Sequence, residues 1–311
     1  MAVPAAMLAG AIGARVALAR PPVKAWTDLA QPLPVVTAWG TLGLVPFAWL
    51  AFAVAAGACA IVSTWGRPAA RGPSLRLTLA CAALTLAAAL AWPVVFSSDV
   101  YAYAAYGDAM LHGLDPYAAP APTMHDAFFD AARWQWGGAT FPACVYGPAF
   151  VALATLLTAA SAGHVAIALW IFRLAACAAF LGSIVAFDRA LQRNERRRLA
   201  VAAYALNPVA LWSAAEGHND AFVLLFVMTA FALMRSRTTI AGFALGFAAA
   251  FKAVALAVPG LVLFSRAEGS SAYRRFALAT LGGVALAIAI ALPVQVHALR
   301  GSGGAPSAPQ F

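Results

Sequence analysis

Long apolar runs constrain the fold of this chain more than any other feature. Several of them reach about 20 residues, the length that a helix needs to cross a hydrocarbon core about 30 Å thick. Only 10% of the 311 residues are charged, whereas an average soluble domain has about 25%. The runs are continuous and do not alternate apolar with polar residues, which argues against a membrane barrel. The sequence therefore predicts an all-α fold, a polytopic membrane helix bundle.

The runs also predict how the chain is organised. Residues 1–34 form an N-terminal segment whose topology the sequence leaves open. Residues 35–299 are expected to form one transmembrane domain, and residues 300–311, which are rich in Gly, Ser, Pro and Ala, a disordered tail. The predicted apolar spans are Val35–Val62, Leu77–Phe96, His164–Phe187, Leu199–Ala215 (interrupted at Asn207-Pro208), Ala221–Met234, Thr239–Phe264 and Phe276–Leu299.

The distribution of positive charge predicts the orientation. The net charge is +9, from 20 Lys and Arg against 11 Asp and Glu. Arginines cluster in short connections between apolar runs, which is typical of cytoplasmic loops, most clearly at residues 189–198. No basic patch interleaved with aromatic residues is present, so nucleic acid is not an expected partner. We expect a multi-pass protein of the inner or plasma membrane, with the lipid bilayer as a partner and its site on the periplasmic or extracellular side.

Residues 98–144 are expected to form a long outer loop that carries interfacial helices. Starting outside at residue 144, the chain needs an odd number of crossings to reach the basic connection at 189–198. The shorter of the two intervening apolar stretches, residues 145–162, is therefore predicted to lie along the outer face as an interfacial helix. The alternative is that both stretches cross and that the basic connection lies outside.

Thr239–Phe264 has basic residues on both flanks, so the same reasoning predicts two short helices that dip into the membrane and return. Lys252 would lie near the tip of this hairpin. A lysine in an apolar run needs an anion or a route to water, and a phosphate headgroup is a natural partner. The alternative is that its amine reaches the interface without a specific partner.

Asp99 is the candidate general base. It follows the apolar run Leu77–Phe96, at the point where a membrane helix should emerge into water, and partial burial there would suit proton transfer from an attacking hydroxyl. The alternative is a solvated aspartate at the end of a helix. Asp108 is nine residues further on, about two and a half helical turns, so the two carboxylates are not expected to form a pair.

The segment from Glu216 to Asp220 is the second polar feature. Glu216, His218 and Asp220 alternate, and they could bind a metal, orient a sugar or cap the helix that begins near Ala221. Asn219 or Asp220 is a suitable N-cap for that helix. The spacing matches no specific metal motif, and the four cysteines have no paired spacing. Neither a metal nor a cofactor is therefore expected.

Several motifs, taken in their order along the chain, carry a family resemblance. They are Ser98-Asp99-Val100-Tyr101-Ala102-Tyr103, Gly113-Leu114-Asp115-Pro116-Tyr117, Tyr146-Gly147-Pro148, Asn207-Pro208, Gly217-His218-Asn219-Asp220, and Gly246 to Lys252 with Pro259. Together they resemble the bacterial polyprenol-phosphate-mannose-dependent α-(1→6)-mannosyltransferases and the catalytic subunit of the eukaryotic GPI mannosyltransferase I, both of the GT-C class. The resemblance covers roughly residues 75–265.

The resemblance implies a glycosyltransferase of the cell envelope. It would move a hexose, expected to be mannose, from a polyprenyl-phosphate sugar donor to a glycan or lipid acceptor on the outer face, with inversion. Asp99 would be the base, Lys252 would neutralise the leaving phosphate, and His218 and Asp220 would hold the sugar or phosphate. The expected substrate-binding residues are Tyr101, Tyr103, Asp108, Tyr146, Glu216, His218, Asn219, Asp220 and Lys252.

Two other hypotheses remain open at this stage. A membrane transporter or flippase for a lipid-linked or anionic substrate would place ionisable residues near the midplane, often within repeats. Here the polar groups gather toward one face, which favours an enzyme. Members of the family continue with further spans after the region matched to Phe276–Leu299, so the other hypothesis is an inactive, truncated member.

Overall fold

The computed structural model describes residues 72–92, 94, 97–118, 125–136, 140–192, 196–264 and 271–301. The predicted segment 1–34 and the predicted span Val35–Val62 lie outside the described residues, and so do residues 302–311 of the predicted tail. Residues 300 and 301, which were also predicted to belong to the tail, are instead the last two residues of the final helix. Throughout the described ranges the regular structure is helical, with no strand, as the apolar runs predict.

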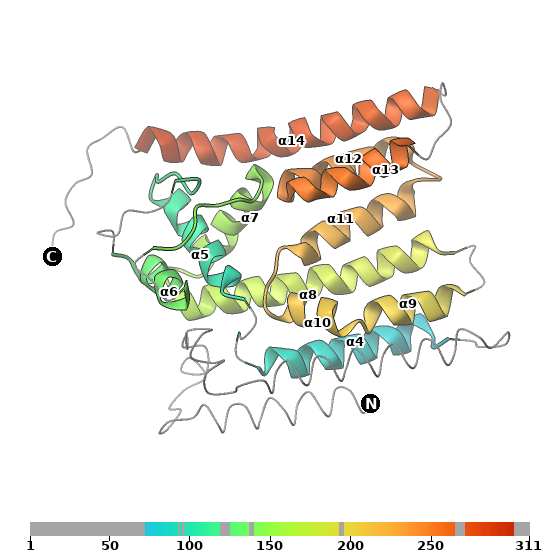
Figure 1. Cartoon of the computed structure of the whole chain (residues 1–311), viewed down its shortest axis with the longest axis horizontal. Coiled ribbons are helices and arrows are strands. Elements are labelled where there is room, and N and C mark those ends of the chain that lie inside the picture. The colour runs from blue at the N-terminus through green and yellow to red at the C-terminus, as the bar shows by residue number, and fades with distance from the viewer. Residues whose placement is uncertain are drawn as a thin grey trace.

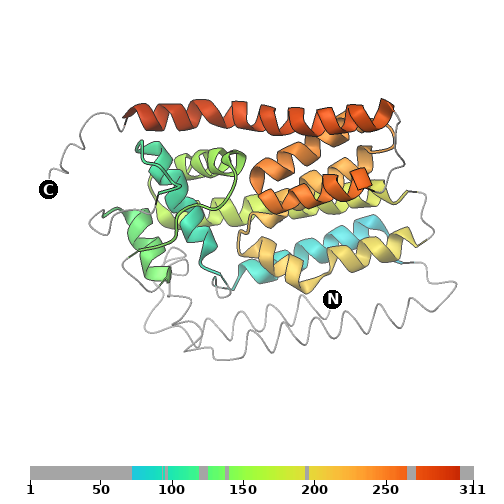
Figure 2. The same ribbon diagram turned by 45° about the horizontal axis from the view of Figure 1, so that its top comes forward.

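Most of the helices run side by side along one direction (Figure 1). These elements are α4 (Leu75–Leu90), α8 (Val165–Ala190), α9 (Arg197–Ala205), α10 (Pro208–Ala215), α11 (Asp220–Leu233), α12 (Thr238–Phe251), the 3₁₀ helix Ala253–Leu256, α13 (Ala257–Phe264) and α14 (Ser271–Gly301). Three further helices, α5 (Asp99–Leu111), α6 (Ala127–Trp136) and α7 (Pro148–Ala159), gather at one end of this array in both ribbon views (Figures 1 and 2). The last residues of α8 and the first residues of α9 lie at the opposite end, and so does the α11–α12 connection, which contains Arg235 and Arg237.

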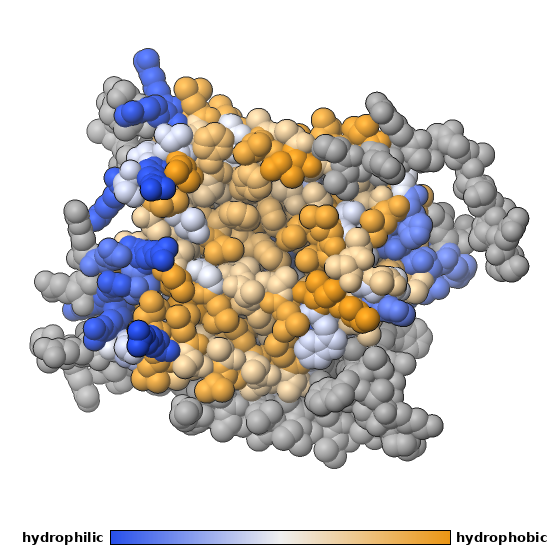
Figure 3. Space-filling view, turned by 180° about the vertical axis from the view of Figure 1, so that it is seen from behind, coloured by the Kyte–Doolittle hydropathy of each residue, from blue (hydrophilic) through white to orange (hydrophobic). Residues whose placement is uncertain are grey.

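Two of the described helices are long and apolar enough to cross a membrane. They are Val165–Ala190 and Arg274–Leu292 within α14, judged by length and composition. On the face that Figure 3 shows, hydrophobic side chains cover the middle of the molecule and hydrophilic side chains lie at its two ends. The predicted span Leu77–Phe96 is a shorter helix that ends at Leu90. Pro93 accounts for this early end, because a proline disfavours the helical conformation of the residue before it.

Two predicted interruptions are present where the sequence indicates them. Asn207 separates α9 from α10, and its side-chain oxygen accepts hydrogen bonds from the N–H groups of Val209 and Ala210 at 3.0 and 3.3 Å. Pro208 can follow at the first helical position because its missing N–H is not needed there. Lys252 separates α12 from the 3₁₀ helix, with an extended backbone (φ −149°, ψ 117°). Thr239–Phe264 therefore forms two helices with Lys252 at the break, as predicted.

Residues 98–144 contain more buried helix than a surface loop would. Every residue of α5 from Val100 to Met110 is buried. Its neighbours are α7, α6 and α8, and the rings of Tyr103 and Phe150 stack edge to face with centroids 4.7 Å apart. The stretch predicted as an interfacial helix, 145–162, is helical at Pro148–Ala159. The helix α5 therefore belongs to the packed interior and can hold its first residue firmly.

Glycines let α12 and α14 approach closely. A Cβ on Gly246 of α12 would lie 2.2 Å from the carbonyl oxygen of Thr280, and a Cβ on Gly283 of α14 would lie 2.4 Å from that of Phe243. Gly242 and Gly246 are one helical turn apart and face the same partner, as in the small-xxx-small pattern of membrane helix pairs. This contact supports Phe251 and Lys252 at the end of α12.

Replacing Gly246 tests this packing. Gly246→Ala should destabilise the protein by about 1–3 kcal/mol, because the methyl group would collide with backbone atoms that cannot rotate away. Gly260→Ala is the matched control, since nothing lies within 4 Å of a Cβ built there. Thermal unfolding in detergent should show a lower midpoint for Gly246→Ala only. Equal midpoints for the two variants would contradict the close approach.

Candidate active site

Asp99 is the first residue of α5, not a residue of a loop. Its N–H donates a hydrogen bond to Ser97 Oγ at 3.2 Å. A carboxylate in the first turn of a helix is stabilised by the positive end of the helix dipole. The side chain remains 29% exposed, so the anion is held by the buried helix and is still accessible.

Two tyrosine hydroxyls converge on this carboxylate. Tyr103, one turn along α5, donates to Asp99 Oδ2 at 3.4 Å, and Tyr146 donates to the same oxygen at 3.3 Å. The two hydroxyl oxygens are themselves 3.3 Å apart. Burial, followed by the charge of Asp99, raises the pKa of Tyr103, and burial raises that of Tyr146 as well. Both side chains are therefore neutral hydrogen-bond donors at ordinary pH.

The motif Tyr146-Gly147-Pro148 reaches Asp99 because Gly147 fits against α12. The N–H of Gly147 donates to the carbonyl of Phe251 at 2.9 Å. A Cβ on Gly147 would lie 2.0 Å from the carbonyl oxygen of Ala250, so only glycine allows this approach. Pro148 then starts α7. The motif thus ties the end of α12 to the hydroxyl of Tyr146.

His218 lies between two carboxylates. Its Nδ1 is 3.6 Å from Asp99 Oδ2, and its Nε2 is 3.9 Å from Glu216 Oε2. Glu216 is buried and accepts a hydrogen bond from Trp212 Nε1 at 3.1 Å. Gly217 makes the turn between them at φ +86°, a conformation that favours glycine. The connection between α10 and α11 is therefore folded toward the first residue of α5.

Opposing effects act on the pKa of His218. Burial lowers it, while the hydrogen-bonding and charge interactions with Glu216 and the charges of Asp99 and Asp220 raise it, and the net result lies above the ordinary value of 6.5. The imidazolium is thus favoured by its neighbours. It places positive charge 3.6 Å from Asp99 Oδ2.

Lys252 and Asp220 form the edge of the cluster. Lys252 Nζ is 2.6 Å from Asp220 Oδ1 and 5.9 Å from the centroid of the Tyr146 ring. The lysine side chain is 31% exposed. The break after α12 and the start of α11 therefore bring a primary amine next to a tyrosine that contacts Asp99.

Asn219 is placed differently from the predicted cap. It occupies the N-cap position of α11, but its side chain makes no capping hydrogen bond. The residue is 0% exposed, and neither Oδ1 nor Nδ2 has a hydrogen-bond partner within the described part of the chain. Its backbone interacts with the Tyr103 hydroxyl instead. Capping by the Asn219 side chain, one of the alternatives for this segment, is therefore wrong.

Two predicted site residues, Tyr101 and Asp108, interact with groups other than Asp99. Tyr101 is buried, and its pKa is raised, chiefly by that burial. The charge of Arg173 lowers the pKa in part, and the charge of Glu216 raises it. Asp108 lies nine residues beyond Asp99, as the spacing argument requires, and its Oδ2 is 3.2 Å from His112 Nδ1. Burial, and then the neighbouring Asp126, raises the pKa of Asp108 to about 6. Across the described residues, no group of three or more His, Cys, Asp or Glu side chains could hold a metal ion.

One charged residue near the site escaped the sequence analysis. Arg173 lies within the apolar run His164–Phe187 and is buried on the side of α8 that faces Glu216 and Tyr101. The signal was available, because a charged residue inside an apolar span is usually functional. Trp212, which binds Glu216, carried no such signal, since a tryptophan in an apolar run is unremarkable.

The assembled groups have a definite chemical capacity. A partly exposed carboxylate receives hydrogen bonds from two tyrosines and faces an imidazole, while a lysine amine stands beyond one of the tyrosines. The carboxylate can accept a proton from a bound hydroxyl. The amine can bind an anionic group. The cluster draws on α5, the segment before α7, the α10–α11 connection, the first residue of α11 and the residue that follows α12.

Comparison with known proteins identifies a family. The family model described as "Alpha-(1->6)-mannopyranosyltransferase, N-terminal domain" matches residues 1–267. The chain is 29% identical over 235 residues to Alpha-(1->6)-mannopyranosyltransferase A of Mycobacterium tuberculosis. That match covers 74% of this chain and 42% of the relative, so less than half of the relative's length is represented. No solved structure matches the chain.

The environment of His218 yields a prediction about pH. Because its folded-state pKa is raised, charged His218 stabilises the fold below pH 6.5, and this stabilisation is lost as the pH rises through the folded-state pKa. Glu216→Gln should lower that pKa, which an NMR titration of the imidazole would measure. Asp130→Asn is the matched control, since Asp130 contacts His125 and Arg133. An unchanged His218 titration in Glu216→Gln would contradict the assignment.

Proposed function

The chain belongs to the α-(1→6)-mannopyranosyltransferase family, and from that premise we propose that it transfers a mannosyl residue from a polyprenyl-phosphate donor to a hydroxyl group of a glycan or lipid acceptor. The observation that carries the proposal is the convergence on Asp99. A single carboxylate oxygen lies within 3.3 to 3.6 Å of Tyr103, Tyr146 and His218. Such a carboxylate is suited to the base that glycosyl transfer with inversion requires.

The proposed reaction is a single displacement. Asp99 takes the proton of the acceptor hydroxyl, and the acceptor oxygen forms a bond to the anomeric carbon. The bond from that carbon to the phosphate oxygen breaks, and the polyprenyl phosphate leaves with the electron pair. Because the nucleophile and the leaving group lie on opposite faces of the sugar, the configuration at the anomeric carbon inverts.

The neighbours of Asp99 would keep it ready for this step. The two tyrosine hydroxyls donate to its Oδ2, which leaves Oδ1 as the atom proposed to face the acceptor. His218, on which positive charge is favoured, lies 3.6 Å from Oδ2 and would help to hold the carboxylate in place. His218 and Asp220 would also contact the sugar or the phosphate.

Lys252 would neutralise the phosphate. The leaving group is already a stable anion, so it needs a nearby positive charge more than it needs protonation. Lys252 has a partly exposed amine that pairs with Asp220, and a donor phosphate would join or replace that carboxylate. Tyr101, Asp108, Glu216 and Asn219 complete the proposed substrate-binding set, with Asp108 furthest along α5 from the base.

A polytopic membrane bundle of the GT-C type would suit such a donor. The two apolar helices of membrane-spanning length and the apolar surface between two hydrophilic ends support it (Figure 3). The α11–α12 connection, which contains Arg235 and Arg237, lies at the end of the bundle opposite α5. By the preference of such connections for the cytoplasm, Asp99 would face the outer side of the inner or plasma membrane.

Replacing the base tests the proposal. Asp99→Asn should lower the rate of mannosyl transfer by roughly 100-fold to 10,000-fold, the usual contribution of a general base. The measurement is transfer of label from radiolabelled polyprenyl-phosphate-mannose into glycan by membranes that contain the full chain. Asp130→Asn, the same change at an exposed position on α6, should keep the wild-type rate.

The possible outcomes separate the hypotheses. Equal transfer by wild type and Asp99→Asn would remove Asp99 from the mechanism. Transfer from none of the three proteins would reject this donor, and a transporter or an inactive protein would then have to be considered.

The role of Lys252 is tested separately. Lys252→Gln should raise the KM for the donor by roughly tenfold or more, since a hydrogen bond to a charged group is lost. Lys252→Arg keeps the charge and should recover most of the affinity. Steady-state kinetics with varied donor would measure both variants. A KM that stays at the wild-type value in Lys252→Gln would show that the phosphate binds elsewhere.

A further inference from the structure

We propose that Arg173 is a positioning residue for the transfer step, which holds the segments carrying Asp99 and Glu216 against one another. The catalytic part of this inference rests on the proposed function. Arg173 lies nine residues into α8 and is 6% exposed. It does not contact the proposed reacting atoms, so it would act through the two segments that it joins.

The guanidinium group binds the ends of two other helices. Its Nε donates to the carbonyl of Ala215 at 2.6 Å, and one terminal nitrogen donates to the carbonyls of Leu90 at 3.1 Å and Trp92 at 3.0 Å. These partners are 42, 83 and 81 residues away in sequence. The guanidinium carbon also lies 5.0 Å from the centroid of the Trp170 ring.

The identity of these acceptors explains why a cation is buried here. Leu90 is the last residue of α4, and Ala215 is the last residue of α10. Carbonyl groups in the last turn of a helix have no partner within it, and they form the negative end of the helix dipole. A guanidinium has several donors in a fixed planar arrangement, so one side chain can serve both ends. A lysine ammonium has the charge but not that geometry.

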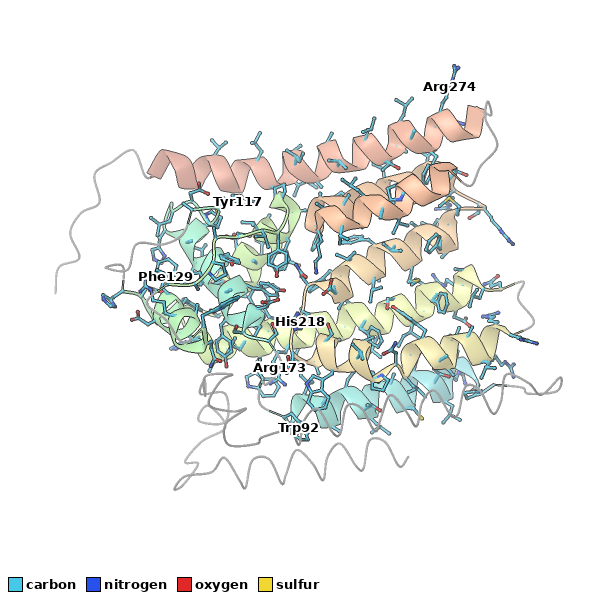
Figure 4. The ribbon with its side chains drawn as sticks, viewed as in Figure 1. Trp92, Tyr117, Phe129, Arg173, His218 and Arg274 are labelled. Carbon is cyan, nitrogen blue, oxygen red and sulfur yellow. The ribbon has the colours of Figure 1, made fainter. Side chains whose placement is uncertain are left out.

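The same side chain lies beneath the junction of the two site segments. Glu216 directly follows Ala215, and Asp99 is seven residues beyond Trp92. A Cβ on Gly217 would lie 3.0 Å from Val100 Cγ2 and 3.3 Å from Arg173 Cγ, so the turn after Glu216 touches both α5 and Arg173. Figure 4 shows Arg173 between the labelled Trp92 and His218.

This arrangement makes the geometry of the base depend on one residue. The 3.6 Å separation between His218 and Asp99 joins the α10–α11 connection to α5, and Arg173 is bonded to the backbone that precedes each of them. If the guanidinium is lost, these segments can shift independently. A shift of about 1 Å in a catalytic group can lower a rate by roughly 100-fold.

Kinetics of charge-conserving variants tests the catalytic part. Arg173→Lys in the full chain should lower kcat for mannosyl transfer by roughly 100-fold and leave the KM for the donor unchanged, because Lys252 is the proposed phosphate ligand. Arg197→Lys is the matched control. Arg197 is bonded to the buried Asp188 near the other end of α8, and its variant should keep the wild-type kcat.

Hydrogen exchange provides a readout that does not need activity. Arg173→Gln should speed amide exchange in residues 97–103 and in residues 214–221 together. The expected increase is roughly tenfold or more, because each segment loses the stabilisation of a hydrogen bond to a charged group. Arg197→Gln should speed exchange around residues 186–201 and leave both site segments unchanged.

Each result bears on one proposal. An equal kcat for Arg173→Lys and wild type, or exchange that rises in only one of the two segments, would overturn the positioning role. Unfolding of the whole chain in both Arg173 variants would also overturn it, because the residue would then support the entire bundle. If the wild type shows no transfer, the proposed function fails, and the exchange experiment still decides whether Arg173 joins the segments.

Discussion

A charge inside an apolar helix must find partners, because an unpaired ion in a low-dielectric interior is strongly unfavourable. In this protein Arg173 meets that requirement with the terminal carbonyl groups of α4 and α10. The same bonds provide acceptors for the cation and donors for two helix ends, which would otherwise be unsatisfied. The chain leaving each of those ends carries one of the acidic residues of the site. The burial of one cation thus brings together segments that are far apart in the sequence.

Above Arg173 the charges alternate in sign. His218 lies between Glu216 and Asp99. Asp220 pairs with Lys252, whose amine lies near the ring of Tyr146. Each anion therefore has a positive or hydrogen-bonding neighbour, and Asp99 receives two tyrosine hydroxyls as well. Asp99 and Lys252 are also partly exposed. This combination of internal compensation and access is what the proposed transfer of a sugar from a phosphate donor to a hydroxyl group would need.

Close backbone contacts make the cluster compact. Gly147 allows Tyr146 to reach over the end of α12, and Gly217 allows the α10–α11 connection to fold onto α5 and α8. The sequence motifs contain both glycines, but their partners cannot be read from the motifs, because Ala250 and Val100 lie more than 100 residues away from them. The burial of α5 was also not predicted, since helices were expected there only at the membrane interface. Its tyrosines and carboxylates suggested a surface loop, whereas its alanines and aromatic rings pack into the interior.

The sequence by itself determined the helical class, the breaks at Asn207-Pro208 and Lys252, and the set of polar residues from which the site is built. These features depend on local properties: the length of apolar runs, the backbone limits of proline and the rarity of charge among apolar residues. Only the tertiary structure decided that Asp99 Oδ2 meets Tyr103, Tyr146 and His218, that Asp108 pairs with His112, and that Arg173 lies beneath the site. The physical reason is that such contacts depend on how α8 packs against helices distant in sequence. No local spacing encodes that packing.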